Sequence, residues 1–142
     1  MSPRNRGKTI KAGDDEAKAR LNAARAFVSV AELVYAEPDD PVLPLRGVAA
    51  AVAVLGGIAA ADAICSVRLG EMFRGDDHTQ AVDLLARAQP EGARVKSDFV
   101  RLLGIKDKVH YQAIIVTPSE AATAIRQSKR MLAAAEEACS PR

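Results

Sequence analysis

The sequence contains few residues that could do chemistry, and they fall in three short segments. In the first segment, Asp62 lies within the apolar stretch 58–64, which reads IAAADAI. A carboxylate in such surroundings must be paired, hydrogen-bonded or exposed to solvent, because burying an unpaired charge is costly. Asp62 is therefore either a paired core acid that fixes the packing of its helix or a carboxylate at the floor of a polar cleft.

The second segment, residues 106–111 (KDKVHY), combines two lysines with an aspartate, a histidine and a tyrosine. In a helix, Lys106 and His110 lie on one face, and Asp107 and Tyr111 on the next. Such a group could bind a phosphate and supply an imidazole that titrates near neutral pH. The alternative is a polar helix end whose histidine is simply hydrogen-bonded.

The third segment, residues 74–78 (RGDDH), could place Arg74 and His78 beside the segment around His110. It could equally be a loop in which an aspartate caps the next helix. Two histidines and an aspartate can bind a metal ion, but their spacing matches no standard metal motif. We therefore predict no metal and no cofactor. The sequence also has no glycine-rich phosphate loop and no serine or cysteine nucleophile motif.

The composition is typical of a single helical domain. The 142 residues are 49% hydrophobic and only 4% aromatic, and alanine is the commonest residue. Alanine favours closely packed helices over sheets, and the chain length suits one domain. The composition excludes a collagen, a disulfide scaffold and a fully disordered chain. The scarcity of aromatic residues also makes recognition by base stacking unfavourable.

The two cysteines, Cys65 and Cys139, are expected to be reduced thiols. The N-terminus has no apolar signal-peptide region, and the longest uncharged run, residues 47–61, is shorter than the ~20 residues of a membrane span. We therefore expect a cytoplasmic protein with no membrane contact.

Apolar periodicity and end signals predict an all-α antiparallel bundle of four to five helices. A basic stretch with Arg4, Arg6, Lys8 and Lys11 precedes the bundle. Residues 1–13 are therefore predicted to be a disordered tail or a nucleic-acid contact arm. Residues 14–142 are predicted to form a single domain. Residues 70–75 and 112–116 are expected to be loops. The expected helices span about 14–36, 46–69, 77–89, 93–111 with an interruption at Gly104, and 118–138.

The order of these features resembles the HEPN superfamily (higher eukaryotes and prokaryotes nucleotide-binding). The shared pattern is a second helix with AAADAI, a loop with GDDH leading into AVDLL, a polar segment KDKVHY, and a last helix with a Ser/Glu start. The resemblance covers about residues 21–138. It implies a small antiparallel helical bundle that binds nucleotide or nucleic acid.

In catalytically active members, an Arg and a His separated by four to six residues cleave RNA without metal, often across a symmetric dimer. His110 matches that His, but the corresponding Arg positions hold Leu103 to Ile105. Arg101 lies too far from His110 along a regular helix. Lys106 is the basic residue nearest to the expected arginine positions, but its side chain lacks the fork geometry of Arg. Some toxin members also carry a Tyr two residues after the His, which a nucleotidyltransferase partner modifies; here Tyr111 follows immediately and Gln112 takes that place.

Three functional hypotheses follow. The chain is a HEPN-like module that binds nucleotide or nucleic acid without catalysis, a metal-independent endoribonuclease of a toxin–antitoxin system, or a structural homodimer or adaptor that packs through the small residues of its second helix. Whether it is an enzyme stays open. The expected partners are RNA or a nucleotide, a nucleotidyltransferase or antitoxin, and a second copy. The predicted catalytic residues are His110, Lys106 and Asp62, and the predicted phosphate-binding residues are Arg74, His78, Arg101, Lys108 and Tyr111.

Overall fold

The computed structural model describes residues 8–112 and 116–141, and for residues 110–112 it describes the backbone alone. Within these ranges the chain forms six helices and a two-stranded sheet. The elements are β1 (Lys8–Lys11), α1 (Asp14–Ala36), α2 (Leu45–Leu69), β2 (Glu71–Arg74), α3 (His78–Arg87), α4 (Glu91–Arg94), α5 (Lys96–Gln112) and α6 (Pro118–Cys139). The all-α class is therefore confirmed, but the described residues hold six helices where four or five were predicted.

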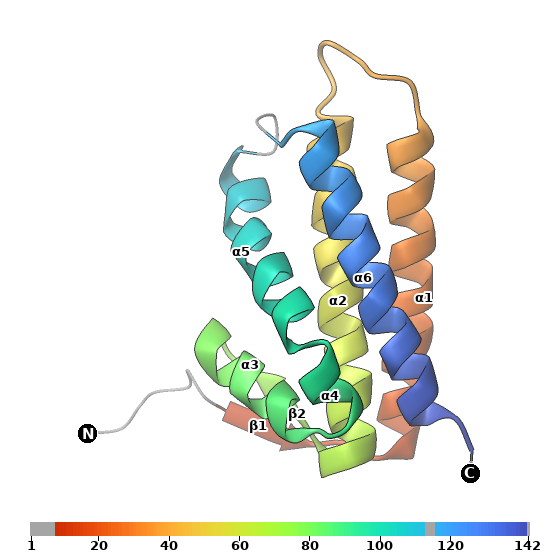
Figure 1. The fold of residues 1–142 in the computed structure, drawn as a ribbon, viewed down its shortest axis with the longest axis vertical. Coiled ribbons are helices and arrows are strands. Elements are labelled where there is room, and N and C mark those ends of the chain that lie inside the picture. Colours follow the sequence, from red (N-terminus) through yellow and green to blue (C-terminus); the bar gives the residue numbers. More distant parts are fainter. Residues whose placement is uncertain (1–7, 113–115, 142) are drawn as a thin grey trace.

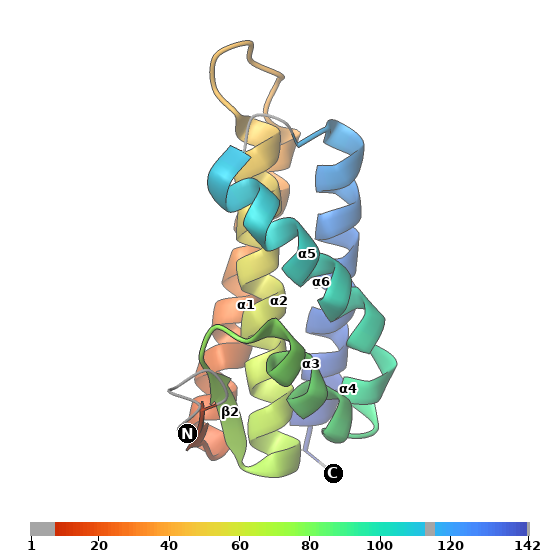
Figure 2. The ribbon, with the colours of Figure 1, turned by 90° about the vertical axis from the view of Figure 1, so that its left-hand side faces the viewer.

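Four long helices build an elongated bundle, with α1 and α5 on opposite sides of α2 and α6 (Figure 1). The central helix is α2, which packs against each of the other three. The short helices α3 and α4 and the β1–β2 sheet close one end of the bundle (Figure 2). By length and composition α2 alone among the described helices could cross a membrane, but 72% of its most apolar window is buried among its neighbours. That burial is typical of a core helix.

The small sheet corrects two predictions. Residues 71–74, expected to be a loop, form β2, which pairs antiparallel with β1. Residues 8–11 are therefore a strand and not part of a disordered tail, while residues 1–7 lie outside the described residues. A strand of four residues is too short for its alternating pattern to be recognised in the sequence. These two strands form by pairing with each other, and about 60 residues of chain separate them.

The predicted helix ends agree well with the structure. α1 has the expected bounds, and Asp77 caps α3 by accepting a hydrogen bond from the backbone N–H of Gln80 at 3.0 Å. Thr117 and Glu120 form the reciprocal capping box at the start of α6. One predicted break is wrong, because α5 continues through Gly104. A single exposed glycine costs a helix only about 1 kcal/mol, which the buried neighbours Leu102 and Leu103 offset.

Two adjacent glycines let α2 approach its neighbours closely. A Cβ atom added at Gly56 would lie 2.8 Å from Ser128 Oγ of α6. A Cβ added at Gly57 would lie 2.5 Å from Leu102 Cδ1 of α5 and 3.3 Å from Met131 Sδ of α6. The glycines therefore weaken the helix propensity of α2 but allow the close packing on which the bundle is built.

The packing at Gly57 can be tested with a matched pair of alanine substitutions. We expect Gly57→Ala to lower the free energy of unfolding by about 1–3 kcal/mol, because the added methyl group overpacks the core. Gly104→Ala should raise it by up to about 1 kcal/mol, because nothing lies within 4 Å of the new methyl group and alanine favours the helix. Urea unfolding followed by circular dichroism measures both, and a stabilised Gly57→Ala protein would contradict the described packing.

A buried ion pair fixes α4 against α2. Arg68 donates hydrogen bonds from Nε and Nη2 to the two carboxylate oxygens of Glu91, at 2.8 and 2.7 Å. The Glu91 side chain is only 3% exposed. These hydrogen bonds from Arg68 hold the pKa of Glu91 below its ordinary value of 4.5, although burial opposes the effect. The charged form of Glu91 is therefore the one that stabilises the fold.

The pH dependence of Glu91→Gln follows from that lowered pKa. A group whose pKa falls on folding contributes stability above its unfolded pKa and loses that contribution as the pH falls through its folded pKa. We expect the substitution to cost about 3 kcal/mol at about pH 7, because it breaks a buried pair, and much less at about pH 3. The exposed pair Arg94–Glu137 supplies the control: Glu137→Gln should leave the unfolding midpoint almost unchanged at both pH values. Equal losses for Glu91→Gln at the two pH values would refute this account.

Candidate functional site

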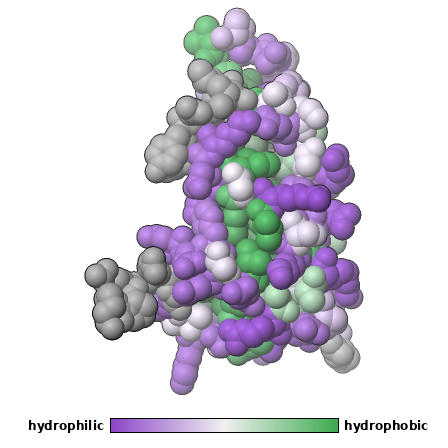
Figure 3. Space-filling view, turned by 60° about the vertical axis from the view of Figure 1, so that its left-hand side comes forward, coloured by the Kyte–Doolittle hydropathy of each residue, from purple (hydrophilic) through white to green (hydrophobic). Residues whose placement is uncertain are grey.

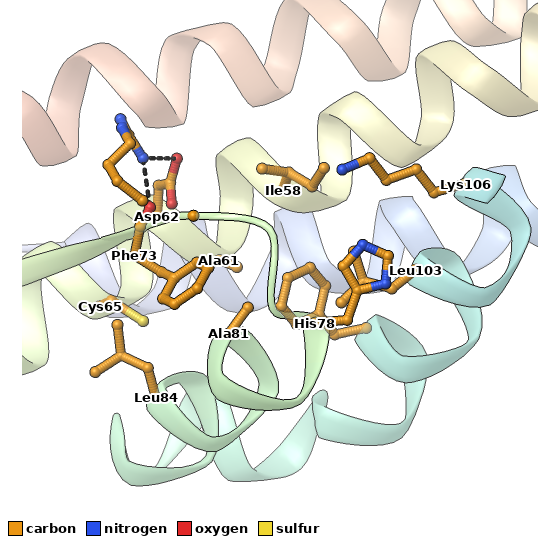
Figure 4. Close-up of a pocket in the computed structure, with 13 residues that line it drawn as sticks. Ile58, Ala61, Asp62, Cys65, Phe73, His78, Ala81, Leu84, Leu103 and Lys106 are labelled. Atoms are coloured by element: carbon orange, nitrogen blue, oxygen red, sulfur yellow. Dashed lines mark hydrogen bonds and ion pairs between the residues drawn. The ribbon is translucent and has the colours of Figure 1, made fainter. Parts of the chain in front are cut away.

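A cavity of about 180 Å³ opens where α3 and β2 meet α2 and α5 (Figure 4). All three segments that the sequence singles out contribute to its lining: Asp62 from the first, Lys106 from the second, and Arg74 with His78 from the third. The remaining lining is largely apolar and includes Ile58, Phe73, Leu84, Phe99 and Leu103. The structure therefore brings together four predicted site residues from four elements.

Local structure explains how each polar group reaches the cavity. Asp62 lies one turn after Ile58 on α2, and Lys106 lies one turn after Leu103 on α5. After β2 the chain turns at Gly75, whose φ of 154° favours glycine, and His78 then begins α3. In Figure 4 the imidazole of His78 lies beside Leu103, and the amino end of Lys106 points toward Ile58.

Asp62 is the one acid among the lining residues, and it is 6% exposed. Its Oδ2 accepts hydrogen bonds from Arg20 Nε at 3.1 Å and from Arg74 Nη1 at 3.4 Å. Burial raises the pKa of the Asp62 carboxyl, and the two guanidinium groups oppose that rise. Asp62 is therefore a paired acid, as one of the two interpretations predicts, and it also lies on the wall of a cavity.

The charges of the cavity lining do not balance. Arg74 and Lys106 are positive and Asp62 alone is negative, and Asp62 also pairs with Arg20 from outside the lining. Within the described residues, Lys106 forms no ion pair. An excess of positive charge beside an apolar cavity is suited to an anion that also has an apolar or planar part.

Three further residues at the candidate site were not predicted from the sequence. Arg20 carries no local signal, since it is one of several charged residues on the polar side of α1, and only the packing of α1 on α2 brings it to Asp62. Phe73 lies in the segment expected to be a loop, and Phe99 is buried in the core; both line the cavity.

Other predicted site residues lie elsewhere. Arg101 is exposed on α5 and does not line the cavity. Lys108 donates a hydrogen bond to Glu120 at 2.6 Å and so links α5 to the first turn of α6. His110 and Tyr111 belong to the last turns of α5, but their side chains lie outside the described residues. The structure therefore does not place either of these two side chains relative to the cavity.

The described side chains include no group of three histidine, cysteine, aspartate or glutamate residues arranged to hold a metal ion. Cys65, which lines the inner part of the cavity, is a free thiol, and its burial raises the pKa to about 12. A thiol with this pKa is almost wholly protonated at neutral pH, so it is a poor nucleophile. Cys65 therefore acts as part of the apolar wall.

The comparisons with known proteins returned no relative: the chain matches no family model and no curated protein sequence. The functional argument therefore depends on the geometry and charge of the cavity.

The two thiols should differ in reactivity. Cys139, at the end of α6, is only half-buried, whereas Cys65 is buried. At about pH 8 we expect iodoacetamide to modify Cys139 first and Cys65 only slowly, because alkylation requires an accessible thiolate. Peptide mass spectrometry after brief exposure measures both rates, and unfolding in urea should make them similar. Equal rates in the native protein would mean that the wall around Cys65 is not closed as described.

Proposed function

We propose that this chain is a HEPN-like helical module that binds a nucleotide or nucleic acid through a phosphate group, at the cavity formed by Asp62, Arg74, His78 and Lys106. The observation that carries the proposal is the meeting of these residues from four separate elements in one cavity that has a single acid. The proposal is for binding, with no chemical step assigned to the site.

The polar groups of the cavity fit a phosphate well. The guanidinium of Arg74 offers several N–H donors in one plane, and the amino group of Lys106, which forms no ion pair within the described residues, adds a positive charge. Asp62 is positioned to hold Arg74 in place, which lowers the conformational entropy that ligand binding would otherwise cost. The His78 imidazole can donate a further hydrogen bond.

The apolar part of the cavity suits the remainder of such a ligand. Phe73 and Phe99 offer aromatic surface, and Ile58 and Leu103 offer aliphatic surface. A volume of about 180 Å³ is small against the roughly 300–1,000 Å³ of typical ligand pockets. We therefore expect the cavity to hold one part of a nucleotide while the rest stays in solvent.

The order of elements supports the HEPN-like part of the proposal. The segment AAADAI lies in α2, the segment GDDH leads into α3, and the segment KDKVHY lies in α5. Under this resemblance the arginine of active members would fall between Leu103 and Ile105. Leu103 is an apolar wall of the cavity, which favours a binding role over ribonuclease activity.

The structural-dimer hypothesis changes in one respect. The small residues of α2 that were expected to face a second copy are buried against α1, α5 and α6 of the same chain. The surface instead exposes larger apolar side chains, including Val30 and Leu33 of α1 and Val48 and Leu55 of α2. Figure 3 shows a hydrophobic strip along one face, bordered by hydrophilic side chains. A homodimer, a nucleotidyltransferase or an antitoxin partner stays a prediction.

The binding role is tested by titrating the protein with adenosine 5′-monophosphate, inorganic phosphate, unphosphorylated adenosine and a short single-stranded RNA in a calorimeter. We expect saturable binding of the phosphate-bearing probes. Lys106→Gln should weaken that binding about tenfold, because one charge-assisted hydrogen bond is lost. Arg74→Gln should weaken it at least as much.

Lys96→Gln is the matched control, because it removes the same charge from an exposed position at the start of α5, outside the cavity. It should leave the affinity almost unchanged. No binding of any probe, or equal losses for Lys96→Gln and Lys106→Gln, would overturn the proposal. Cleavage of the RNA by the wild-type protein, abolished by His110→Ala, would instead establish the ribonuclease.

A further inference from the structure

The β1–β2 sheet places Lys8 across from a residue that lines the cavity. In the register of the sheet, Lys8 of β1 is the cross-strand partner of Arg74, and Lys11 is the partner of Glu71. Directly opposite residues in an antiparallel pair have Cβ atoms about 5 Å apart and share one face of the sheet. Lys8 is exposed, and its partner Arg74 lines the cavity.

The two cross-strand pairs differ in their electrostatics. Lys11 faces the opposite charge of Glu71, which is a favourable arrangement. Lys8 faces the like charge of Arg74, and like charges directly opposite each other destabilise a sheet. Asp62, the carboxylate that pairs with Arg74, is already shared between Arg20 and Arg74. Lys8 therefore adds a further positive charge across the sheet from a cation of the cavity.

We propose that Lys8 supplies a second phosphate contact next to the cavity, so that the site prefers a ligand with two neighbouring phosphate groups over one with a single phosphate. Arg74 and Lys106 contact the first phosphate, and Lys8 contacts the second. Two adjacent phosphates occur in a nucleoside diphosphate and in a phosphorylated oligonucleotide, and both offer the same anionic oxygens. This inference depends on the function proposed above, because it assigns the second phosphate of the same ligand.

The preference is measured by calorimetric titration of the full chain with adenosine 5′-monophosphate, adenosine 5′-diphosphate and a 5′-phosphorylated adenosine dinucleotide. We expect the wild-type protein to bind both two-phosphate probes more tightly than the monophosphate. Lys8→Gln should weaken binding of the two-phosphate probes about fivefold, as one solvent-exposed charge contact is lost, and leave the monophosphate affinity within about twofold. Lys8→Gln should also reduce, by about one, the steepness with which the logarithm of the dinucleotide binding constant falls with the logarithm of the salt concentration, because about one counterion fewer is released.

Lys11→Gln is the matched control, because it removes the same charge from the same strand at a position whose cross-strand partner, Glu71, carries the opposite charge. It should retain the preference of the wild-type protein for two phosphates. The diphosphate and the dinucleotide arms distinguish a free nucleotide from a nucleic-acid end as the source of the phosphates. Circular dichroism and the thermal midpoint check that each variant is folded.

The possible failures are distinguishable. If the wild-type protein binds none of the three probes, the proposed function is wrong. If it binds all three with equal affinity and Lys8→Gln behaves as the wild type, the binding function stands and the second contact does not exist. If Lys11→Gln weakens binding as much as Lys8→Gln, the effect comes from overall charge, and the role of Lys8 is refuted.

Discussion

The burial of α2 among three other helices is the constraint on which the rest of the structure depends. A helix with so many small and apolar residues is stable in water only when its surface is covered, and Gly56 and Gly57 let α5 and α6 come close enough to cover it. Asp62 lies on α2 where the bundle opens into the cavity, and Arg20 of α1 and Arg74 of β2 reach its carboxylate there.

A buried carboxylate in turn determines what surrounds it. Because an unpaired charge at this position would be costly, Asp62 needs cations, and it obtains them from α1 and from the end of β2. The two arginines hold three elements together around one oxygen atom of Asp62. One carboxylate cannot neutralise both arginines, so the interaction that joins these three elements also leaves the cavity lining with more positive than negative groups.

The sequence predicts those features of the fold that local chemistry determines. The bounds of α1, the aspartate cap of α3 and the start of α6 depend on residues a few positions apart, and the structure agrees with the sequence on all three. The β1–β2 pair and the contact of Arg20 with Asp62 depend on residues about 40 to 60 positions apart. No local pattern encodes them, because each becomes favourable only after the helices have packed. The candidate site was accordingly predicted as three separate segments, and a meeting was anticipated only for the second and third, as one of two possibilities.

The nature of the cavity wall bears on the choice between binding and catalysis. Cleavage of a phosphodiester requires groups that stabilise charge in the transition state and groups that transfer protons, held in fixed positions. In this chain the cations come from β2 and from Lys106, whereas the neighbouring position on α5 that faces the cavity is Leu103. Lysine is a flexible point charge, and leucine supplies only apolar surface. The described wall therefore supports the proposal of binding, and no chemical step is assigned to it.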